Sequence, residues 1–197
     1  MFEAMQEVSR VRSTKYRRNP NCAEPFGKEQ THVKPLSPDY IAGFIDGEGS
    51  FSICINKQKT TRNGIEIRPE FAIELRADDR EILERIMVTI GCGKIYDCSY
   101  ERYGWFPHAK YRISSYRLLV EYLIPFLDKH PLQAKKAVVY RLWRQVVLMV
   151  YQKEHLTEKG LRKIRELRIE IRKHGKKQKM GTARIRENRS SGGVENT

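Results

Sequence analysis

The sequence has few cysteines, and they form no recognisable site. Only four occur in 197 residues, Cys22, Cys54, Cys92 and Cys98, with no Cys-x-x-Cys pair and no histidine at zinc spacing beside them. This usage predicts reduced, structural cysteines, which are typical of an intracellular protein. Long apolar runs are absent as well, since none reaches the roughly 18 residues of a membrane span and the N-terminus has no signal-type apolar core. The sequence therefore predicts a protein that has no membrane segment and is not exported.

Acidic residues are few relative to basic ones. The chain has 38 Lys and Arg against 24 Asp and Glu, which gives a formal net charge of +14 and a pI of about 9.7. This balance predicts a polyanionic partner, and it favours nucleic acid over an anionic membrane. Residues 158–197 alone carry 13 basic against 5 acidic residues. We expect this C-terminal segment to supply much of the long-range attraction.

The length allows one domain with a substantial core, but not two large domains. Residues 1–35 have scattered Arg, Asn and Pro without periodicity, which predicts a flexible basic N-terminal arm whose contact with DNA stays open. An ordered domain is expected over 36–150, a basic C-terminal helix over 151–175 and a disordered basic tail over 176–197. The basic helix has a narrow apolar seam made of Leu161, Ile164, Leu167 and Ile171.

Apolar periodicity predicts the order helix, two strands, helix, two strands and further helices. Ser37 is a good N-cap and Pro38 a good first helical residue, so the first helix is expected to end near Asp46. The other expected elements are strands over 50–56 and 65–75, a helix over 78–91, strands over 93–99 and 105–114, and helices over 114–127, 130–152 and 156–175. This order predicts an α+β fold with a four-stranded antiparallel sheet.

The expected strands alternate apolar and polar residues, so one face of the sheet is expected under helices and the other in water. Ala72 falls on the outward side of its strand, and Pro69 marks an edge or bulge position. Trp105 and Trp143 are expected in the core. A curved, wet sheet face suits the DNA major groove, which accepts a two-stranded ribbon.

The stretch IAGFIDGEG, residues 41–49, places two carboxylates where the first helix ends. Gly43 and Gly47 strip one helix face of side chains, which permits close approach of a second helix. Asp46 and Glu48 meet the negative end of the helix dipole, so a cation must compensate them. Mg²⁺ suits carboxylate and glycine carbonyl oxygens, and two copies packed through this face would bring two Glu48 side chains together beside a two-fold axis. The alternative is a helix C-cap whose two acids are merely solvated.

These residues resemble the signature of the LAGLIDADG homing endonucleases, with Ile41 at the first Leu and Glu48 at the final Asp. The likeness continues in the spacing from Phe71 to Gly93 and in HPLQAKKAVVY, and it covers residues 36–150. It implies an αββαββα fold with a saddle-shaped sheet on double-stranded DNA, and the single signature implies a homodimer. It also implies an intron-encoded enzyme of a bacterial cytoplasm or an organelle. Such an enzyme uses Mg²⁺, with Mn²⁺ as a substitute, to make a staggered double-strand break in a long, nearly palindromic site.

The resemblance also carries roles to individual residues. Glu48 is the expected metal-binding and catalytic acid, and Gly47 is expected to add its carbonyl as a ligand. Lys136 matches a catalytic lysine near the scissile phosphate, with Lys135 as the alternative. Asp46, at the first acidic position of the signature, is favoured for a structural role. The implied dimer interface is made of Ile41, Ala42, Gly43, Phe44 and Asp46.

Strand parity selects residues for DNA contact. The positions opposite the apolar set, with the basic residues of the loop between the first two strands, are Ser52, Asn56, Lys57, Lys59, Arg62, Arg68, Glu70, Tyr96, Lys110 and Arg112. Arg68 and Arg112 suit guanine edges, whereas the loop residues suit phosphates. One departure from the family is Leu75, where some members have a solvent-organising Gln, so that role is vacant or passes to Arg76 or Glu74.

Other classes of function stay open from the sequence. One is an RNA maturase that assists the splicing of its host intron, or a decayed endonuclease that only binds DNA, and the basic C-terminal helix would suit RNA. Another is a basic structural or ribosome-associated protein, which would leave the glycines and acids of residues 41–49 unexplained. The presence of both Glu48 and Lys136 favours the enzyme.

Overall fold

The computed structural model describes residues 33–59, 64–100 and 104–175. Most of the predicted N-terminal arm, the predicted C-terminal tail, Cys22 and Arg62 lie outside these ranges. Within them, Cys54, Cys92 and Cys98 are free, with Cys92 buried and Cys54 exposed. No helix in these ranges is both long and apolar enough to cross a membrane.

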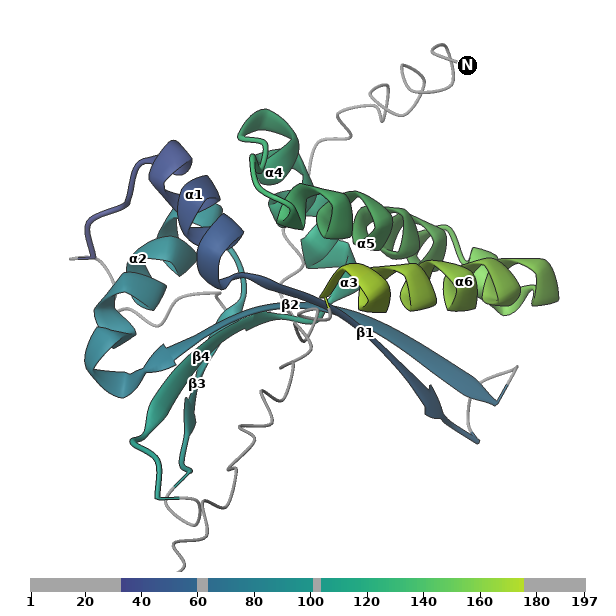
Figure 1. The fold of residues 1–197 in the computed structure, drawn as a ribbon, viewed down its shortest axis with the longest axis horizontal. Helices are drawn as coiled ribbons and strands as arrows, with labels where there is room; N and C mark the ends of the chain where they lie inside the picture. The colour runs from purple at the N-terminus through teal and green to yellow at the C-terminus, as the bar shows by residue number, and fades with distance from the viewer. Residues whose placement is uncertain (1–32, 60–63, 101–103, 176–197) are drawn as a thin grey trace, which may run out of the picture.

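The order of elements confirms the predicted α+β plan (Figure 1). The elements are α1 (Pro38–Glu48), β1 (Ser50–Lys57), β2 (Ile65–Arg76), η4 (Ala77–Asp79), α2 (Arg80–Ile90), β3 (Lys94–Cys98), β4 (His108–Ile113), α3 (Tyr116–Leu118), η6 (Leu119–Leu123), α4 (Ile124–Lys129), α5 (Lys136–Tyr151), η7 (Glu154–Leu156) and α6 (Glu158–Gly175). The segment η6 is π-helical, so the helix predicted over 114–127 is a single run in three parts.

The four strands form one antiparallel sheet in the order β1-β2-β4-β3, which leaves β1 at a free edge. Pro69 pairs with Ile53 of β1, whereas the pairing of β2 with β4 starts only at Phe71. Pro69 therefore lies where one side of β2 has no partner strand in the described sheet. That position tolerates a residue without a backbone N–H, and the predicted edge role is confirmed.

The described helices all lie on one side of the sheet (Figure 1). The largest fully buried side chains between the two layers include Phe71, Tyr111 and Trp143. The indole of Trp143 also donates a 3.0 Å hydrogen bond to the carbonyl of Ser52, which fixes α5 on β1. The other side of the sheet carries polar side chains and no described helix, and we call it the open face.

Three sequence-based expectations were wrong in detail. Trp105 is 64% exposed and its ring packs at a tilt against Tyr100, at 6.0 Å between centroids, because it precedes β4 at the end of a hairpin that no described helix covers. Ala72 is outward by parity but only 6% exposed, since its short side chain lies in register with the longer Arg112. The helix predicted from His130 begins at Lys136, because the preceding residues form a loop that contacts α1.

The apolar seam of the C-terminal helix is buried, as predicted. Leu161, Ile164, Leu167 and Ile171 are each at most 9% exposed. The helix α6 packs along α5, and Arg168 donates a 2.9 Å hydrogen bond to the carbonyl of Ile53 in β1. The seam therefore holds α6 beside the free edge of the sheet.

Candidate active site at the end of α1

The first helix is shaped by its caps and by one close glycine contact. The Ser37 hydroxyl accepts from the N–H of Tyr40 at 3.4 Å, and Pro38 occupies the first helical position. At the other end the N–H of Gly49 donates to the carbonyl of Ile45 at 2.9 Å. A Cβ at residue 49 would lie 2.7 Å from that same carbonyl oxygen, so only glycine allows the chain to turn directly into β1. The turn places Glu48 at the junction of helix and strand.

Asp46 binds the backbone of the loop before α5. Its Oδ2 accepts from the N–H of Gln133 at 2.6 Å and from the N–H of Ala134 at 3.1 Å. A carboxylate is favourable there, because the first turn of a helix presents unpaired N–H groups and the positive end of the dipole. The structure thus gives Asp46 a contact of the structural kind. Its Oδ1 is buried and has no hydrogen-bond partner among the described residues.

Lys136 makes the reciprocal contact from α5 to α1. Its Nζ donates to the carbonyl of Gly47 at 2.8 Å and to the carbonyl of Ile45 at 3.1 Å. Burial lowers the pKa of Lys136 from its ordinary value, although the charges of Glu48 and Asp46 oppose that shift. The ammonium group lies at the negative end of α1, so it offsets part of the negative charge there without pairing directly with either acid.

A third contact joins the same two segments. The His130 imidazole lies 2.9 Å from a carboxylate oxygen of Asp39, in the first turn of α1. We call these contacts together, made by Asp39, Asp46 and Lys136 with residues of the other segment, the α1–α5 clamp. The clamp was not predicted from the sequence. Pro131 was the one signal that residues 130–135 would not be part of the helix.

Glu48 differs from Asp46 in having no partner. Its side chain is exposed, and it makes no hydrogen bond or ion pair with any residue of the described ranges. Gly47 is exposed beside it, and its carbonyl already attracts the ammonium of Lys136. Carboxylate and backbone carbonyl oxygens are ligand types that a hard divalent metal ion prefers, and here the Gly47 carbonyl accepts from Lys136. However, no three His, Cys, Asp or Glu side chains converge anywhere in these ranges, so one chain offers an incomplete ligand set.

One face of α1 is open. A Cβ added at Gly43 or Gly47 would meet nothing within 4 Å. The aromatic rings of Tyr40 and Phe44 stack on the same face at 6.0 Å, and Tyr40 is 49% exposed. Of the predicted interface residues, Ile41 and Ala42 are instead buried within the chain itself, and Asp46 is half-buried in the clamp. The part of α1 available to a partner is therefore the strip of Tyr40, Gly43, Phe44 and Gly47.

The predicted DNA-contacting residues in the strands do lie on the open face, but several have intramolecular partners. Arg68 pairs with Glu66 at 2.8 Å, Lys110 lies 3.6 Å from Glu74, and the guanidinium of Arg112 covers the ring of Tyr96 at 4.5 Å from its centroid. The remaining described candidates are Ser52, Asn56, Lys57, Lys59 and Glu70, of which Glu70 lies 3.7 Å from Arg112.

With Leu75 at this position, no residue obviously takes the solvent-organising role that a Gln has in some family members. Leu75 is half-buried against the core, opposite to the open face. Its neighbour Glu74 accepts a 2.6 Å hydrogen bond from Tyr100, and Arg76 is paired with Asp78 at 2.9 Å. Both named substitutes are therefore already engaged within the chain.

The structure is an α+β protein in which α1 ends at a candidate metal site, and its sheet has one open face. The model of the family described as "LAGLIDADG endonuclease" matches residues 41–147, which is more than half of the chain. The chain belongs to the LAGLIDADG endonuclease family. The match includes most of α1, the whole sheet and most of α5, and it leaves α6 outside.

Individual relatives agree with this assignment. A probable intron-encoded endonuclease of Neurospora crassa is 28% identical over 137 residues, which cover 68% of this chain and 28% of that protein. I-SmaMI bound to an uncleaved DNA target in the presence of calcium ions has a TM-score of 0.65 and 32% identity, covering 70% of this chain and 45% of the other. The homing endonuclease I-TnaI has a TM-score of 0.63 and 30% identity, covering 71% of this chain and 96% of the other. The chain thus spans less than half of the first two proteins and nearly all of I-TnaI.

The role of Asp46 in the clamp predicts a stability effect that is separate from catalysis. Asp46→Ala leaves the N–H groups of Gln133 and Ala134 without their acceptor, and we expect it to lower the free energy of unfolding by about 2 kcal/mol. Asp46→Asn keeps one oxygen acceptor and should cost less. Chemical denaturation followed by circular dichroism measures both.

The matched control is Asp39→Ala on the same helix. Asp39 is 93% exposed in its pair with His130, so its removal should change stability much less than that of Asp46. Equal losses for the two alanine variants would show that the Asp46 contact does not hold the loop.

Proposed function

We propose that this protein is a site-specific homing endonuclease that makes a staggered double-strand break in a long pseudo-palindromic DNA site with Mg²⁺, and that Mn²⁺ can substitute. The observation that carries the proposal is the unpartnered Glu48 beside the Gly47 carbonyl and Lys136, in a chain of the LAGLIDADG family. The structural relative I-SmaMI, which is described as bound to DNA with calcium, supports both a DNA substrate and a divalent metal.

The proposal includes a homodimer, because one chain offers an incomplete set of metal ligands in the described ranges. The strip of Tyr40, Gly43, Phe44 and Gly47 is open, and small residues on a helix allow another helix to approach closely. Two copies packed through this strip about a two-fold axis would place the two Glu48 side chains near each other. The combined set would complete the ligands that a single chain does not provide.

The proposed site divides its work among four groups. Glu48 and the Gly47 carbonyl would hold the divalent ion. When bound, that ion supplies charge neutralisation at the scissile phosphate and lowers the pKa of water. Lys136 lies beside both ligands and stabilises negative charge on the phosphate. Asp46 positions the whole turn, because it holds the loop that carries Lys136.

The open face supplies the contacts with the bases. Its curved antiparallel strands suit the major groove, and the intramolecular pairs of Arg68, Lys110 and Arg112 hold these side chains in place before DNA arrives. When DNA binds, each of these basic side chains exchanges its carboxylate partner for a base edge or a phosphate. This favours DNA sites that offer a new partner to both the basic and the acidic member of each pair. The basic loop residues Lys57 and Lys59 are exposed and suit phosphates.

Removal of the Glu48 charge tests the catalytic assignment. Glu48→Gln keeps the size of the side chain but removes the negative charge, and we expect at least about a 100-fold loss in the cleavage rate of a duplex that carries the joined exon sequence of the host intron. Binding to the same duplex in Ca²⁺ should persist. Gel analysis of both strands gives the rate and the stagger.

Asp39→Asn is the control, since it removes an acid from the same helix away from the site. Cleavage by Glu48→Gln at the wild-type rate would refute the mechanism. Splicing assistance that survives Glu48→Gln, in a protein that never cuts DNA, would identify a maturase instead.

The dimer is tested by a charge on the open strip. Gly43→Glu should fold normally, because nothing lies within 4 Å of its Cβ position and Glu is a better helix former than Gly. It should sediment as a monomer, because two copies would bring like charges together, and it should lose double-strand cleavage. Gln145→Glu on the exposed side of α5 makes the same charge change and should stay dimeric. A dimeric Gly43→Glu would place the interface elsewhere.

A further inference from the structure

The helix α6 is an addition to the matched family region and lies against the DNA-reading part of the sheet. Its buried seam faces α5, and its middle contacts the free edge of β1 through Arg168 and Ile53. Its last turn reaches the proposed active site, where Ile171 and His174 line a depression of about 590 Å³ that Asp46 and Lys136 also line. α6 therefore runs along the edge of the sheet toward the site of cleavage.

The charges of α6 are not arranged evenly around the helix. On its outer surface, basic residues are neutralised by acids one turn away, with Lys173 at 3.1 Å from Glu170, Lys163 at 3.6 Å from Glu166 and Arg162 at 3.9 Å from Glu158. By contrast, Arg165, Arg168 and Arg172 have no ion pair with any residue of the described ranges. Their spacing of three and four residues puts them on one side of the helix. We call these three arginines the basic stripe.

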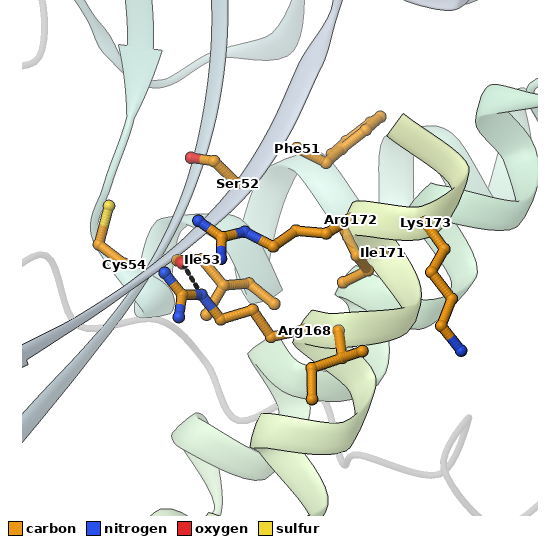
Figure 2. Close-up of a pocket in the computed structure, with 9 residues that line it drawn as sticks. Phe51, Ser52, Ile53, Cys54, Arg168, Ile171, Arg172 and Lys173 are labelled. Atoms are coloured by element: carbon orange, nitrogen blue, oxygen red, sulfur yellow. Dashed lines mark hydrogen bonds between the residues drawn. The ribbon is translucent and has the colours of Figure 1, made fainter. Parts of the chain in front are cut away.

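Two members of the basic stripe, Arg168 and Arg172, line the groove beside the edge strand β1, and Arg165 precedes them on the same side of the helix. Figure 2 shows the guanidinium groups of Arg168 and Arg172 extending to the backbone of β1, beside Ser52 and Cys54, whereas the ammonium of Lys173 points away. Arg168 uses its Nε to bind the carbonyl of Ile53, which leaves its two terminal nitrogens to face outward. The groove between α6 and β1 measures about 890 Å³. It is bordered by Ser52 and Cys54, which are the β1 residues of the open face.

The stripe differs from the cations of the open face in having no acidic partner in the described ranges. Arg68, Lys110 and Arg112 each contact an acid of the sheet, so an anion must compete with a carboxylate for them. An anion that meets the stripe displaces no carboxylate. Arg165 and Arg172 are about 10 Å apart along the helix axis, which is roughly the rise of three nucleotides in one DNA strand. The stripe therefore has the charge and the length for consecutive phosphates.

We propose that the basic stripe holds the phosphate backbone of double-stranded DNA along the flank of the segment that β1 and β2 read. This inference rests on the proposed function, since it takes the open face to be the DNA-reading surface. The stripe borders that face directly, so a duplex whose major groove receives the strands brings one phosphate backbone past the edge of β1. Duplex RNA fits less well, because its major groove is too narrow and deep for side chains to read.

The salt dependence of binding tests the stripe. Arg165→Gln and Arg172→Gln are compared with wild type on two fluorescein-labelled duplexes in Ca²⁺, one with the joined exon sequence and one of random sequence. Each variant should weaken binding to both duplexes by a similar factor, about threefold to tenfold. Each should also reduce the slope of log Kd against log salt by about 1 for every copy of the chain on the duplex.

Lys173→Gln and Lys163→Gln are the matched controls, because they remove the same charge from the same helix. Lys173 borders the same groove as Arg172, but its ammonium points away from β1 and pairs with Glu170 (Figure 2). An effect of Lys173→Gln equal to that of Arg172→Gln would reduce the stripe to general charge and overturn the proposal. An unchanged slope in both arginine variants would also overturn the proposal. The same titration is repeated with a single-stranded RNA probe, and a loss of binding that appears only with this probe would overturn it as well. If wild type neither selects nor cuts the exon duplex with Mg²⁺, the proposed endonuclease function fails. The random-sequence duplex still tests the stripe in that case.

Discussion

The exchange of charges between the end of α1 and the start of α5 is the interaction on which the site depends. Asp46 leaves the negative end of its own helix to bind N–H groups at the positive end of α5, and Lys136 leaves α5 to bind the last carbonyls of α1. Each group would be unfavourable near the end of its own helix and is favourable at the end of the other. Two segments almost 90 residues apart in sequence are thereby fixed at the point where α1 enters the sheet.

The clamp also separates the roles of the two acids in the signature. Asp46 has its charge committed to the loop, whereas Glu48, two residues later, has no partner in the described ranges and lies beside the Gly47 carbonyl. Lys136 holds that same carbonyl, so its ammonium is already at the place where negative charge would gather on a phosphate. The open strip of α1 leaves room for a second copy to add its own Glu48. Structural and catalytic functions thus share three consecutive residues of α1, from Asp46 to Glu48.

The fold could be predicted from local patterns because the relevant signals are local. Ser37 and Pro38 mark the start of α1, alternation defines β1 and β2, and the buried seam of α6 follows from a spacing of three and four residues. The residues of the site could be named because the stretch 41–49 is distinctive. Their partners could not be predicted, since Asp46 binds backbone groups of Gln133 and Ala134, and a backbone N–H carries no sequence signal. Trp105 was misplaced for a related reason, because its burial depends on whether a helix covers that end of the sheet. Some basic residues of α6 pair with an acid and others do not. This difference can be recognised in the sequence only once the side of the helix that faces β1 is known.

A crystal structure of the protein with an uncleaved exon duplex and Ca²⁺ is the sharpest test that Glu48 binds the metal ion while Asp46 holds the loop before α5. We expect two copies on one duplex, with Ca²⁺ about 2.3–2.6 Å from Glu48 carboxylate oxygens and from a Gly47 carbonyl. Asp46 should still accept from the N–H groups of Gln133 and Ala134. A single copy on the duplex, a metal ion bound away from Glu48, or an Asp46 that has left the loop to bind the metal would contradict it.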